Sequence, residues 1–514
     1  MIKERSLFSD SVTTTIASFG AQFLTFVISA FIAAQYGATS KTDAFFYALS
    51  AVVVVNAAVS GVLKSVFTSV FLRFVHKEKQ NDKEILASFY LYFLIFLFAV
   101  WSLFNVSSYL VTIYVAVPGI PDRELLFRVA FQLSFMIIFN GLVECFSTVY
   151  NTYQKFIVPI LTPILRSFFF IGFVWLTLEN IGVESLSIGN SLAEFFHMIL
   201  LFIILKTRGS YFGLSLNLHP AVRKMMTISL PSFLSNATTR INEFIDASFV
   251  APVIIGGVTI VNYANKISSI PAILLSGGFL TVILTHWSLK KNVDGEDSLK
   301  DSVLNSLLAI GTIFIPVLVI MFVLREPLVK LMYERKNFTP ELTYKTAMLV
   351  GLYLFGLLPL MLGRILTRAF LTLEDTWTPF WVGNIRAVVN VCFNFILIGL
   401  FGYIGVAIST SLTSLLLFSF MIIKLRTRLR IIFNKNYLLE WGKIFLSGLI
   451  TGIAIYELKK LLFDGFVGIV VLGIVEEITA IGSISVTGLL IYLMICYFFK
   501  AQKLFELLKL IKKG

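Results

Sequence analysis

The sequence is poor in charge and in cysteine for its length. Only 14% of its 514 residues are charged and 57% are hydrophobic, and the mean hydropathy is +0.88. This composition is too apolar for a soluble protein of that size. The three cysteines, Cys145, Cys392 and Cys496, lie far apart within apolar segments and form neither a metal-binding nor a redox spacing. We therefore expect an integral membrane protein without cysteine chemistry.

Motifs for catalysis and for nucleic-acid binding are also missing. We find no phosphate-cradling glycine loop, no nucleophile motif and no metal constellation among its four histidines. The formal charge of +13 does not indicate nucleic acid, because Lys and Arg concentrate in alternate loops between hydrophobic runs. No soluble segment is left over for a separate domain. We expect a protein that is not an enzyme and whose function lies within the bilayer.

What the sequence does contain is a series of apolar runs of membrane-spanning length, about 20 residues each. They predict an all-α membrane protein with about fourteen transmembrane helices. The predicted helices are 11–35, 43–73, 86–111, 126–150, 157–178, 184–205, 226–251, 257–287, 302–323, 343–371, 379–400, 402–424, 440–461 and 481–500. Their spacing predicts a six-helix N-lobe (1–210), a six-helix C-lobe (211–430), and two further helices with a basic tail (431–514), a repeat common in transporters.

Lys and Arg set the expected orientation of these helices. They gather in the connections "RFVHKEKQNDKE" and "KLRTRLR", in the linker after residue 205, and in the C-terminal tail. By the positive-inside rule these segments are cytoplasmic, as are both termini. The connection "REPLVKLMYERKNFTPEL" falls outside although it carries four cations. We expect a short amphipathic segment on the outer membrane surface there, the alternative being a miscounted helix.

Ionisable side chains inside the predicted spans cost a few kcal/mol or more, and each is a functional candidate by default. On helix 226–251, Arg240, Glu243 and Asp246 follow at spacings of three and share one face. Two interpretations stay open. The stripe neutralises itself through Arg240 and Glu243, or it lines a water-filled cavity in which Arg240 meets an anion.

The stretch "NYANKISSIP" places Lys266 about ten residues into its predicted helix, which is deep for a side chain that reaches an interface. Asn262, Tyr263 and Asn265 add hydrogen-bonding groups beside it, and Pro271 allows the helix to bend. The alternatives are a snorkelling lysine and a cavity residue at a site that opens and closes.

Further buried cations are expected at Lys64 and Arg166 in the first half and at Arg364 and Arg386 in the second, with Arg368 marking a cytoplasmic helix end. If they converge, the cavity suits a phosphate-bearing substrate, because guanidinium and ammonium groups form charge-assisted hydrogen bonds with phosphate oxygens. The last group, Glu144, Glu194 and His197, is interpreted either as a proton relay or, for the latter two, as a local structural pair.

Five ordered motifs resemble signatures of the MurJ/MviN family of lipid II flippases, which belongs to the multidrug/oligosaccharidyl-lipid/polysaccharide exporter superfamily. The motifs are "QYGATSKTDAFFYA", "RINEFIDASF", "NYANKISSIP", "YERKNFTPELT" and "RAFLTLEDTWTP". The resemblance covers roughly residues 8–430. It implies two six-helix lobes around a central cavity and a lipid-facing groove formed by the last two helices. It also implies alternating access that carries an undecaprenyl-diphosphate-linked sugar to the outer leaflet.

The chain departs from the family pattern at several positions. Lys266 stands where the family usually has arginine in "YADR", and Asn265 replaces the acidic neighbour, whereas Asp246 matches an acidic family position. The first helix lacks the family's arginines, and the second retains only Asn56, Gly61 and a displaced Lys64. A flippase for a surface-polysaccharide repeat unit is therefore the main alternative. A cation-coupled drug exporter and a membrane-embedded glycosyltransferase are the others.

The predicted site has two groups of residues. Substrate binding is assigned to Lys266, Arg240, Lys64, Asn265, Asn56, Arg364 and Arg386. Gating or ion coupling is assigned to Asp246, Glu243, Glu144 and Pro271. We expect no metal and no cofactor, with transport coupled to the membrane potential or to an ion. The expected partners are a polyprenyl-diphosphate-linked saccharide, membrane lipids and proteins of cell-envelope synthesis, at the bacterial cytoplasmic membrane, and no nucleic acid.

Overall fold

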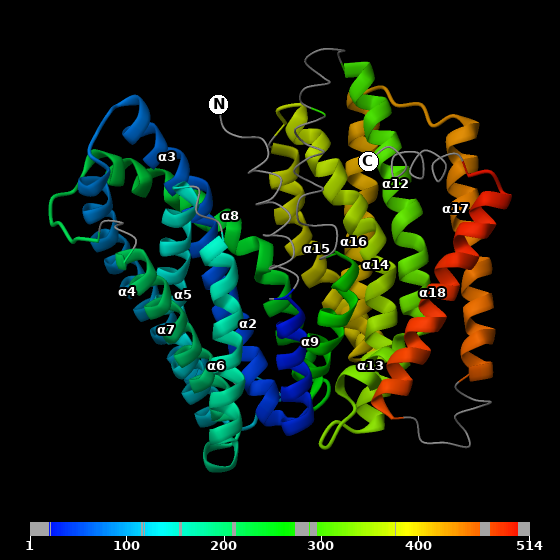
Figure 1. The fold of residues 1–514 in the computed structure, drawn as a ribbon, viewed down its shortest axis with the longest axis horizontal. Coiled ribbons are helices and arrows are strands. Elements are labelled where there is room, and N and C mark those ends of the chain that lie inside the picture. The colour runs from blue at the N-terminus through cyan, green and yellow to red at the C-terminus, as the bar shows by residue number, and fades with distance from the viewer. Residues whose placement is uncertain are drawn as a thin grey trace. The chain divides into compact units, whose positions relative to one another are not determined.

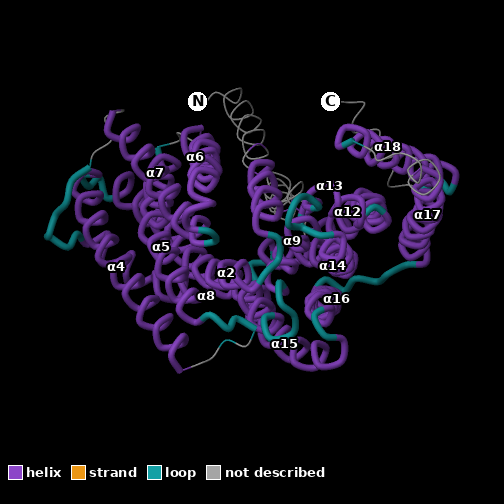
Figure 2. Tube along the Cα trace, turned by 90° about the horizontal axis from the view of Figure 1, so that it is seen from below, coloured by secondary structure: helices purple, strands orange, loops and turns teal. Residues whose placement is uncertain are grey.

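The structure is a computed structural model of the whole chain (Figure 1), and it describes residues 20, 22–114, 117, 119–153, 157–207, 212–272, 287, 296–375, 377–462 and 473–501. All regular structure in these ranges is helical (Figure 2), which confirms the predicted all-α class. The helices are Gln22–Tyr36, α2 (Ser40–Val62), α3 (Thr68–Leu72), α4 (Asp82–Tyr114), α5 (Arg123–Thr152), α6 (Ile157–Ile181), α7 (Glu184–Thr207), α8 (Pro220–Val250), α9 (Gly257–Ser268), α12 (Glu296–Val323), α13 (Arg325–Tyr333), α14 (Pro340–Thr372), α15 (Trp377–Phe401), α16 (Ile404–Arg428), α17 (Lys435–Lys459) and α18 (Ile474–Phe498).

Within the described ranges, eleven helices are long and apolar enough to cross a membrane. The other three predicted spans have identifiable counterparts. The helix Gln22–Tyr36 is apolar but shorter. The helix α8 corresponds to the predicted span 226–251 and carries the charged stripe of Arg240, Glu243 and Asp246. The predicted helix 257–287 begins with α9, and most of its remaining residues are not among those that the structure describes. The chain is a multi-pass membrane protein.

The helix ends follow side chains that can be found in the sequence. Thr39 caps α2, with the Thr39 amide donating to Thr42 Oγ1 over 2.8 Å and the Thr42 amide donating to Thr39 Oγ1 over 3.3 Å. Asp122 accepts from the third residue of α5 over 2.8 Å, and Asn434 does the same for α17 over 2.8 Å. Such caps satisfy amides that the first turn leaves free, so each helix begins at a fixed residue.

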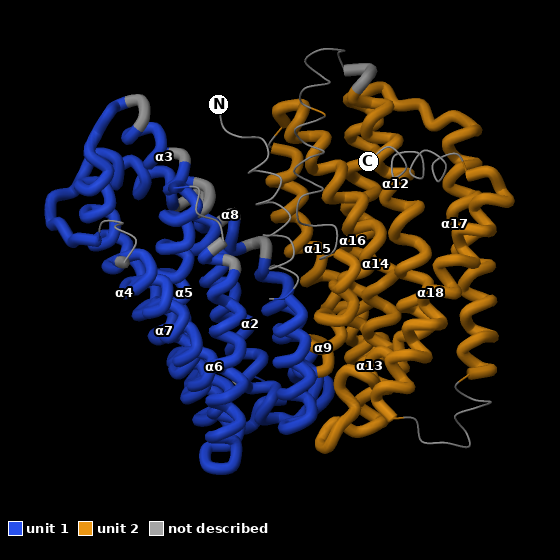
Figure 3. Tube along the Cα trace, viewed as in Figure 1, with its two compact units in different colours: residues 1–259 blue, residues 260–514 orange. Residues whose placement is uncertain are grey.

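By packing, the chain forms two compact units, residues 1–259 and 260–514 (Figure 3). In the first, α2 packs against α5 and α8, and α7 packs against α5 and α6. In the second, α16 packs against α14 and α15, while α17 and α18 pack against each other and against α12. The division of the chain into 1–210, 211–430 and 431–514 stays a prediction.

The connection that breaks the positive-inside rule contains α13, a helix of nine residues. Charged side chains of this segment form ion pairs and hydrogen bonds within the second unit. Lys330 pairs with Glu477 at the start of α18 over 3.0 Å, and Glu326 lies 4.0 Å from Lys459 at the end of α17. Arg335 donates to two carbonyls of the last turn of α13 over 2.8 and 3.1 Å. Lys330 and Arg335 therefore have local structural partners, and the position of this segment on the outer membrane surface stays a prediction.

Candidate functional site

The helix α9 has one polar and one apolar face. Asn262, Asn265, Lys266 and Ser269 are half-buried and follow at spacings of three, one and three, so they line one side of the helix. The side-chain oxygen of Asn262 is buried and accepts no hydrogen bond from the residues that the structure describes. The polar side of α9 thus carries an ammonium group, two amides and a hydroxyl close together.

The opposite face of α9 is fixed by aromatic packing. Tyr263 is fully buried, and its ring centroid lies 4.6 Å from that of Tyr333 and 5.9 Å from that of Phe338. Tyr333 ends α13 and Phe338 follows it. Aromatic pairs at these separations contribute about 0.5–1.5 kcal/mol beyond their buried area. This anchoring sets which side of α9 presents Lys266.

The first turn of α9 is held by Asp43, a fully buried residue of α2. Asp43 Oδ2 accepts from the amide of Gly256 over 2.7 Å, and Oδ1 accepts from the amide and the hydroxyl of Thr259 over 2.9 and 2.8 Å. A carboxylate at a helix N-terminus satisfies free amides and interacts favourably with the helix dipole. Asp43 therefore acts as a distant N-cap for the helix that carries Lys266.

The turn before α9 depends on glycine. Gly256 has φ of +80°, and a Cβ there would lie 2.6 Å from the carbonyl oxygen of Ala38. Asp43 lies in the motif "QYGATSKTDAFFYA", but sequence reasoning assigned it no role. An acidic residue in a first helical turn is common, so no local signal showed that its partner was Thr259, 216 residues later.

The predicted stripe on α8 is partly a salt bridge. Arg240 Nη1 donates to Glu243 Oε1 over 2.6 Å, and both side chains are about half exposed, at 54% and 49%. Asp246, one turn further, is buried. The guanidinium of Arg240 is therefore compensated by a carboxylate one turn away, as the first of the two interpretations expects. An anion that approached Arg240 would have to share it with Glu243.

The helices α2 and α8 pack closely at Gly61. A Cβ on Gly61 would be 2.1 Å from Asn236 Cγ, so only glycine allows this contact. Asn56 lies on the same helix, and its side-chain oxygen is buried without a hydrogen-bond donor among the described residues. A buried amide oxygen without a donor is uncommon in folded proteins.

We expect Gly61→Ala to destabilise the protein by about 1–3 kcal/mol, because the added methyl group overpacks against Asn236. The measurement is thermal unfolding in detergent. The double variant Gly61→Ala/Asn236→Gly should lose less stability than the two single variants together, because removal of the Asn236 side chain removes the clashing atoms. Losses that simply add would contradict this packing.

Lys64 lies where the α-helical register changes. Residues Leu63–Phe67 form a π-helical turn directly after α2, and a second one spans Arg73–Lys77. Such turns are rare and occur often at functional sites. The backbone of Lys64 is in the first of them, whereas its side chain lies outside the described part, so its role stays a prediction.

The predicted cations of the second unit lie on α14 and α15. Arg364 is exposed, and Arg368, one turn later, is half-buried. Arg386 on α15 is also half-buried. Both helices pack on α16. Pro271 is buried just beyond α9, and residues 270–272 are helical up to the end of the described range. The substrate-binding and gating roles of these residues stay predictions.

One predicted cation of the first unit has a clear structural partner. Arg166 Nε lies 2.7 Å from Glu194 Oε1, and Arg166 Nη2 donates to Asn190 over 3.2 Å. His197 Nδ1 lies 3.5 Å from Glu194 Oε2, and its Nε2 is 2.9 Å from Thr162 Oγ1. The cluster joins α6 to α7 in the interior. The charge of Arg166 is thus compensated within the unit, and Glu194 and His197 form the local pair that the spacing suggested.

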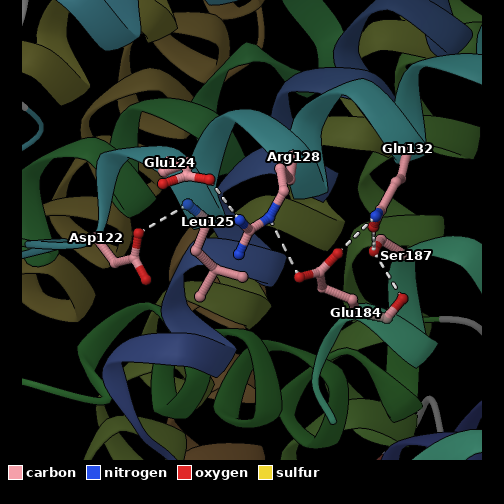
Figure 4. Close-up of polar contacts among 7 residues, drawn as sticks. All are labelled: Asp122, Glu124, Leu125, Arg128, Gln132, Glu184 and Ser187. Atoms are coloured by element: carbon pink, nitrogen blue, oxygen red, sulfur yellow. Dashed lines mark hydrogen bonds and ion pairs between the residues drawn. The ribbon is translucent and has the colours of Figure 1, made fainter. Parts of the chain in front are cut away.

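A second polar network joins the starts of α5 and α7 (Figure 4). Arg128 bridges Glu124 and Glu184 over 2.7 and 3.3 Å. Gln132 donates to Glu184 over 2.7 Å and accepts from Ser187. Figure 4 shows these side chains pointing toward one another between the two helices. They were not singled out in the sequence, because polar residues at predicted helix ends are unremarkable there.

The structure therefore groups some predicted residues and leaves others apart. Lys266 and Asn265 share a face of α9, and Arg240 pairs with Glu243. Glu144 is half-buried on α5, and its role in coupling stays a prediction, as does the convergence of cations from both units. In the part of the chain that is described, no three His, Cys, Asp or Glu side chains are placed to hold a metal ion.

Comparison with known families decides the identity of this fold. The model of the family described as lipid II flippase MurJ matches residues 32–476. The chain belongs to the MurJ family of lipid II flippases. MurJ membership confirms the resemblance carried by the five motifs and puts the chain among transporters rather than enzymes.

Curated MurJ relatives match over most of their length. The probable lipid II flippase MurJ of Rickettsia prowazekii (strain Madrid E) is 25% identical over 419 residues, which cover 80% of this chain and 82% of that protein. The lipid II flippase MurJ of Burkholderia cenocepacia (strain J2315) is 22% identical over 406 residues, covering 75% of this chain and 78% of that protein.

Solved structures agree on the fold. A lipid II flippase MurJ in an inward closed conformation superposes with a TM-score of 0.77 at 21% identity, covering 95% of this chain and 99% of that one. An inward-facing multidrug resistance MATE family transporter of the MOP superfamily gives 0.64 at 13% identity, covering 81% of this chain and 94% of that one. The fold is thus shared with the wider superfamily.

Proposed function

We propose that this protein is a flippase that moves lipid II from the cytoplasmic to the outer leaflet of the bacterial inner membrane by alternating access. Its relatives in Rickettsia prowazekii and Burkholderia cenocepacia are named for that substrate. The structural observation that carries the proposal is the polar face of α9, with Lys266 and Asn265 on one side and the anchored Tyr263 on the other.

The chemistry of that face suits a diphosphate. A lysine ammonium offers three donors to phosphate oxygens, and such charge-assisted bonds are about twice as strong as neutral ones. The amides of Asn262 and Asn265 add neutral hydrogen-bond donors for the sugar-phosphate linkage without adding charge. Arg240, Lys64, Asn56, Arg364 and Arg386 are proposed as further contacts to the headgroup along its path.

Gating and coupling are proposed for Asp246, Glu243, Glu144 and Pro271. Moving a headgroup with about two negative charges across the membrane involves the potential, at about 2.3 kcal/mol per charge per 100 mV. With a negative interior, outward movement of that anion is favourable. The basic loops support cytoplasmic termini, and the expected protein partners are those of cell-envelope synthesis.

Complementation in a bacterium depleted of its own lipid II flippase tests the function. Survival of cells that express this protein is the expected result. Failure to grow, with normal insertion of the protein into the membrane, would overturn lipid II as the substrate. A fluorescent fusion and a membrane fraction provide the insertion control.

A flippase for a surface-polysaccharide repeat unit is the second candidate. It is favoured by the first helix, since the segment from Ser18 to Gln35 has no charged residue where the family has arginines. The two substrates share the polyprenyl diphosphate and differ in the sugar. Restored capsule export in a strain that lacks its own repeat-unit flippase, without rescue of peptidoglycan synthesis, would favour this candidate.

A further inference from the structure

The first unit holds an apolar cavity of about 510 Å³ that none of the predicted site residues with described side chains lines. It lies between α4, α8 and the π-helical turn that follows α2. Its walls include Phe93 and Val100 of α4, Met225 of α8 and Phe67 of the turn. All of these elements belong to one compact unit, so the cavity does not depend on how the two units are arranged.

The chemistry of the cavity walls disfavours both an empty cavity and one filled with water. Nearly all of its walls are hydrocarbon, apart from Ser107, Ser229 and Tyr92, and the Tyr92 hydroxyl already donates to the carbonyl of Leu216 over 2.9 Å. Water in a cavity needs two to four polar partners, and an empty space this large forfeits dispersion contacts. The remaining filler is hydrocarbon.

The cavity opens toward the surroundings of the helices. Two of its lining residues, Leu103 and Met226, are 67% and 53% exposed. Because α4 is long and apolar enough to cross a membrane, exposed apolar side chains on it such as Leu103 suit contact with lipid chains. A hydrocarbon chain can therefore enter sideways from the bilayer.

A cation stands beside this opening. Arg223 lies one turn before Met226 on the same side of α8 and is exposed. It has no carboxylate partner among the residues that the structure describes. Of the two carboxylates in the first turn of α4, Asp82 accepts from the Tyr153 hydroxyl over 2.8 Å and Glu84 accepts from the Asn81 amide over 3.1 Å. An anionic headgroup is thus attracted to Arg223.

We propose that this cavity binds one acyl chain of an anionic phospholipid whose phosphate contacts Arg223. The site is distinct from the polar face of α9, none of whose residues lines the cavity. The chain fills the space between α4 and α8 as a structural ligand. A phospholipid is favoured over the substrate's polyprenyl chain because such a lipid is abundant, and a structural site at a fixed helix junction must be occupied continuously.

Photolabelling tests the proposal without any transport measurement. The full chain is reconstituted in vesicles of phosphatidylglycerol and phosphatidylcholine that contain phosphatidylglycerol with a diazirine in one acyl chain. After illumination, labelled peptides are mapped by mass spectrometry. We expect label on α4 and α8 at the cavity walls, and at least tenfold less in Met225→Trp and in Val100→Phe, which fill the space.

Matched variants separate the site from general lipid contact. Leu176→Trp adds the same side chain on α6, where Leu176 is 69% exposed outside the cavity, and should leave the labelling of α4 and α8 unchanged. Arg223→Gln should lower the preference for phosphatidylglycerol over phosphatidylcholine severalfold, whereas Arg428→Gln, an exposed cation elsewhere, should not.

Two results would overturn the proposal. One is labelling of α4 and α8 that neither cavity-filling variant reduces, although both are folded by circular dichroism. The other is displacement of the label by undecaprenyl phosphate but not by unlabelled phosphatidylglycerol, which would assign the cavity to a polyprenyl chain. Both results are independent of whether lipid II is the transported substrate.

Discussion

Replacing Lys266 by methionine should reduce transport by about ten- to a hundredfold. Hydrogen bonds to charged groups contribute about 1.5–3 kcal/mol, and 1.4 kcal/mol is a factor of ten. Methionine keeps much of the side-chain volume and removes the ammonium group, so the packing of Tyr263 behind it should stay intact. The measurement is the rate at which lipid II reaches the outer leaflet of vesicles, followed by its accessibility to an added enzyme.

The charge at position 266 should matter more than the identity of the residue. Lys266→Arg should retain most of the transport, because guanidinium binds phosphate oxygens at least as well. Lys345→Met is the matched control, since Lys345 pairs with the exposed Glu341 over 2.6 Å at the start of α14, and exposed pairs contribute little. Full transport by Lys266→Met would remove the leading site residue.

The helices of this protein could be predicted because their signals are local. Each apolar run and its cap lie within a few residues of each other, as at Thr39 before α2 and at Asn434 before α17. The polar face of α9 was also within reach, because Asn262, Asn265 and Lys266 follow the helical period. The fold class and family followed from such short stretches.

The partners of the charged residues could not be predicted, because those contacts join distant parts of the chain. Arg166 was counted among the available cations, yet Glu194, on the next helix, compensates it. Tyr263, which fixes the face of α9 that carries Lys266, packs against Tyr333, and the helix α12 lies between these two tyrosines in the sequence. The motif "RAFLTLEDTWTP" also contains residues that stabilise the fold.

In that motif, Asp375 accepts from the amide and the hydroxyl of Thr378 over 2.9 and 2.5 Å and so fixes the start of α15. The Thr378 hydroxyl that donates to its carboxylate holds the pKa of Asp375 below its usual range. Lys424 of α16 donates to the same hydroxyl over 2.6 Å. A motif residue can thus serve helix capping rather than contact with a substrate.

Asp43→Ala should loosen the start of α9 and stop transport. The variant leaves the amides of Gly256 and Thr259 and the Thr259 hydroxyl without their acceptor, and each buried unsatisfied group costs about 1–3 kcal/mol. Hydrogen exchange at the amides of residues 256–262 measures this directly. We expect exchange at least a hundredfold faster than in the unmodified protein, since two tenfold steps require only about 2.8 kcal/mol.

Two milder changes separate the capping role of Asp43 from its charge. Asn434→Ala removes the cap of α17 at a cost of about 0.5–2 kcal/mol and should leave exchange at the start of α9 unchanged. Asp43→Asn keeps one acceptor, so its exchange and its transport should both lie between those of the unmodified protein and Asp43→Ala. If Asp43→Asn stopped transport while the amides of Gly256 and Thr259 stayed protected, the carboxylate would act through its charge, and the capping role would be wrong. If exchange and transport change together, the position of Lys266 depends on a hydrogen-bonded helix start more than two hundred residues away from Asp43 in sequence.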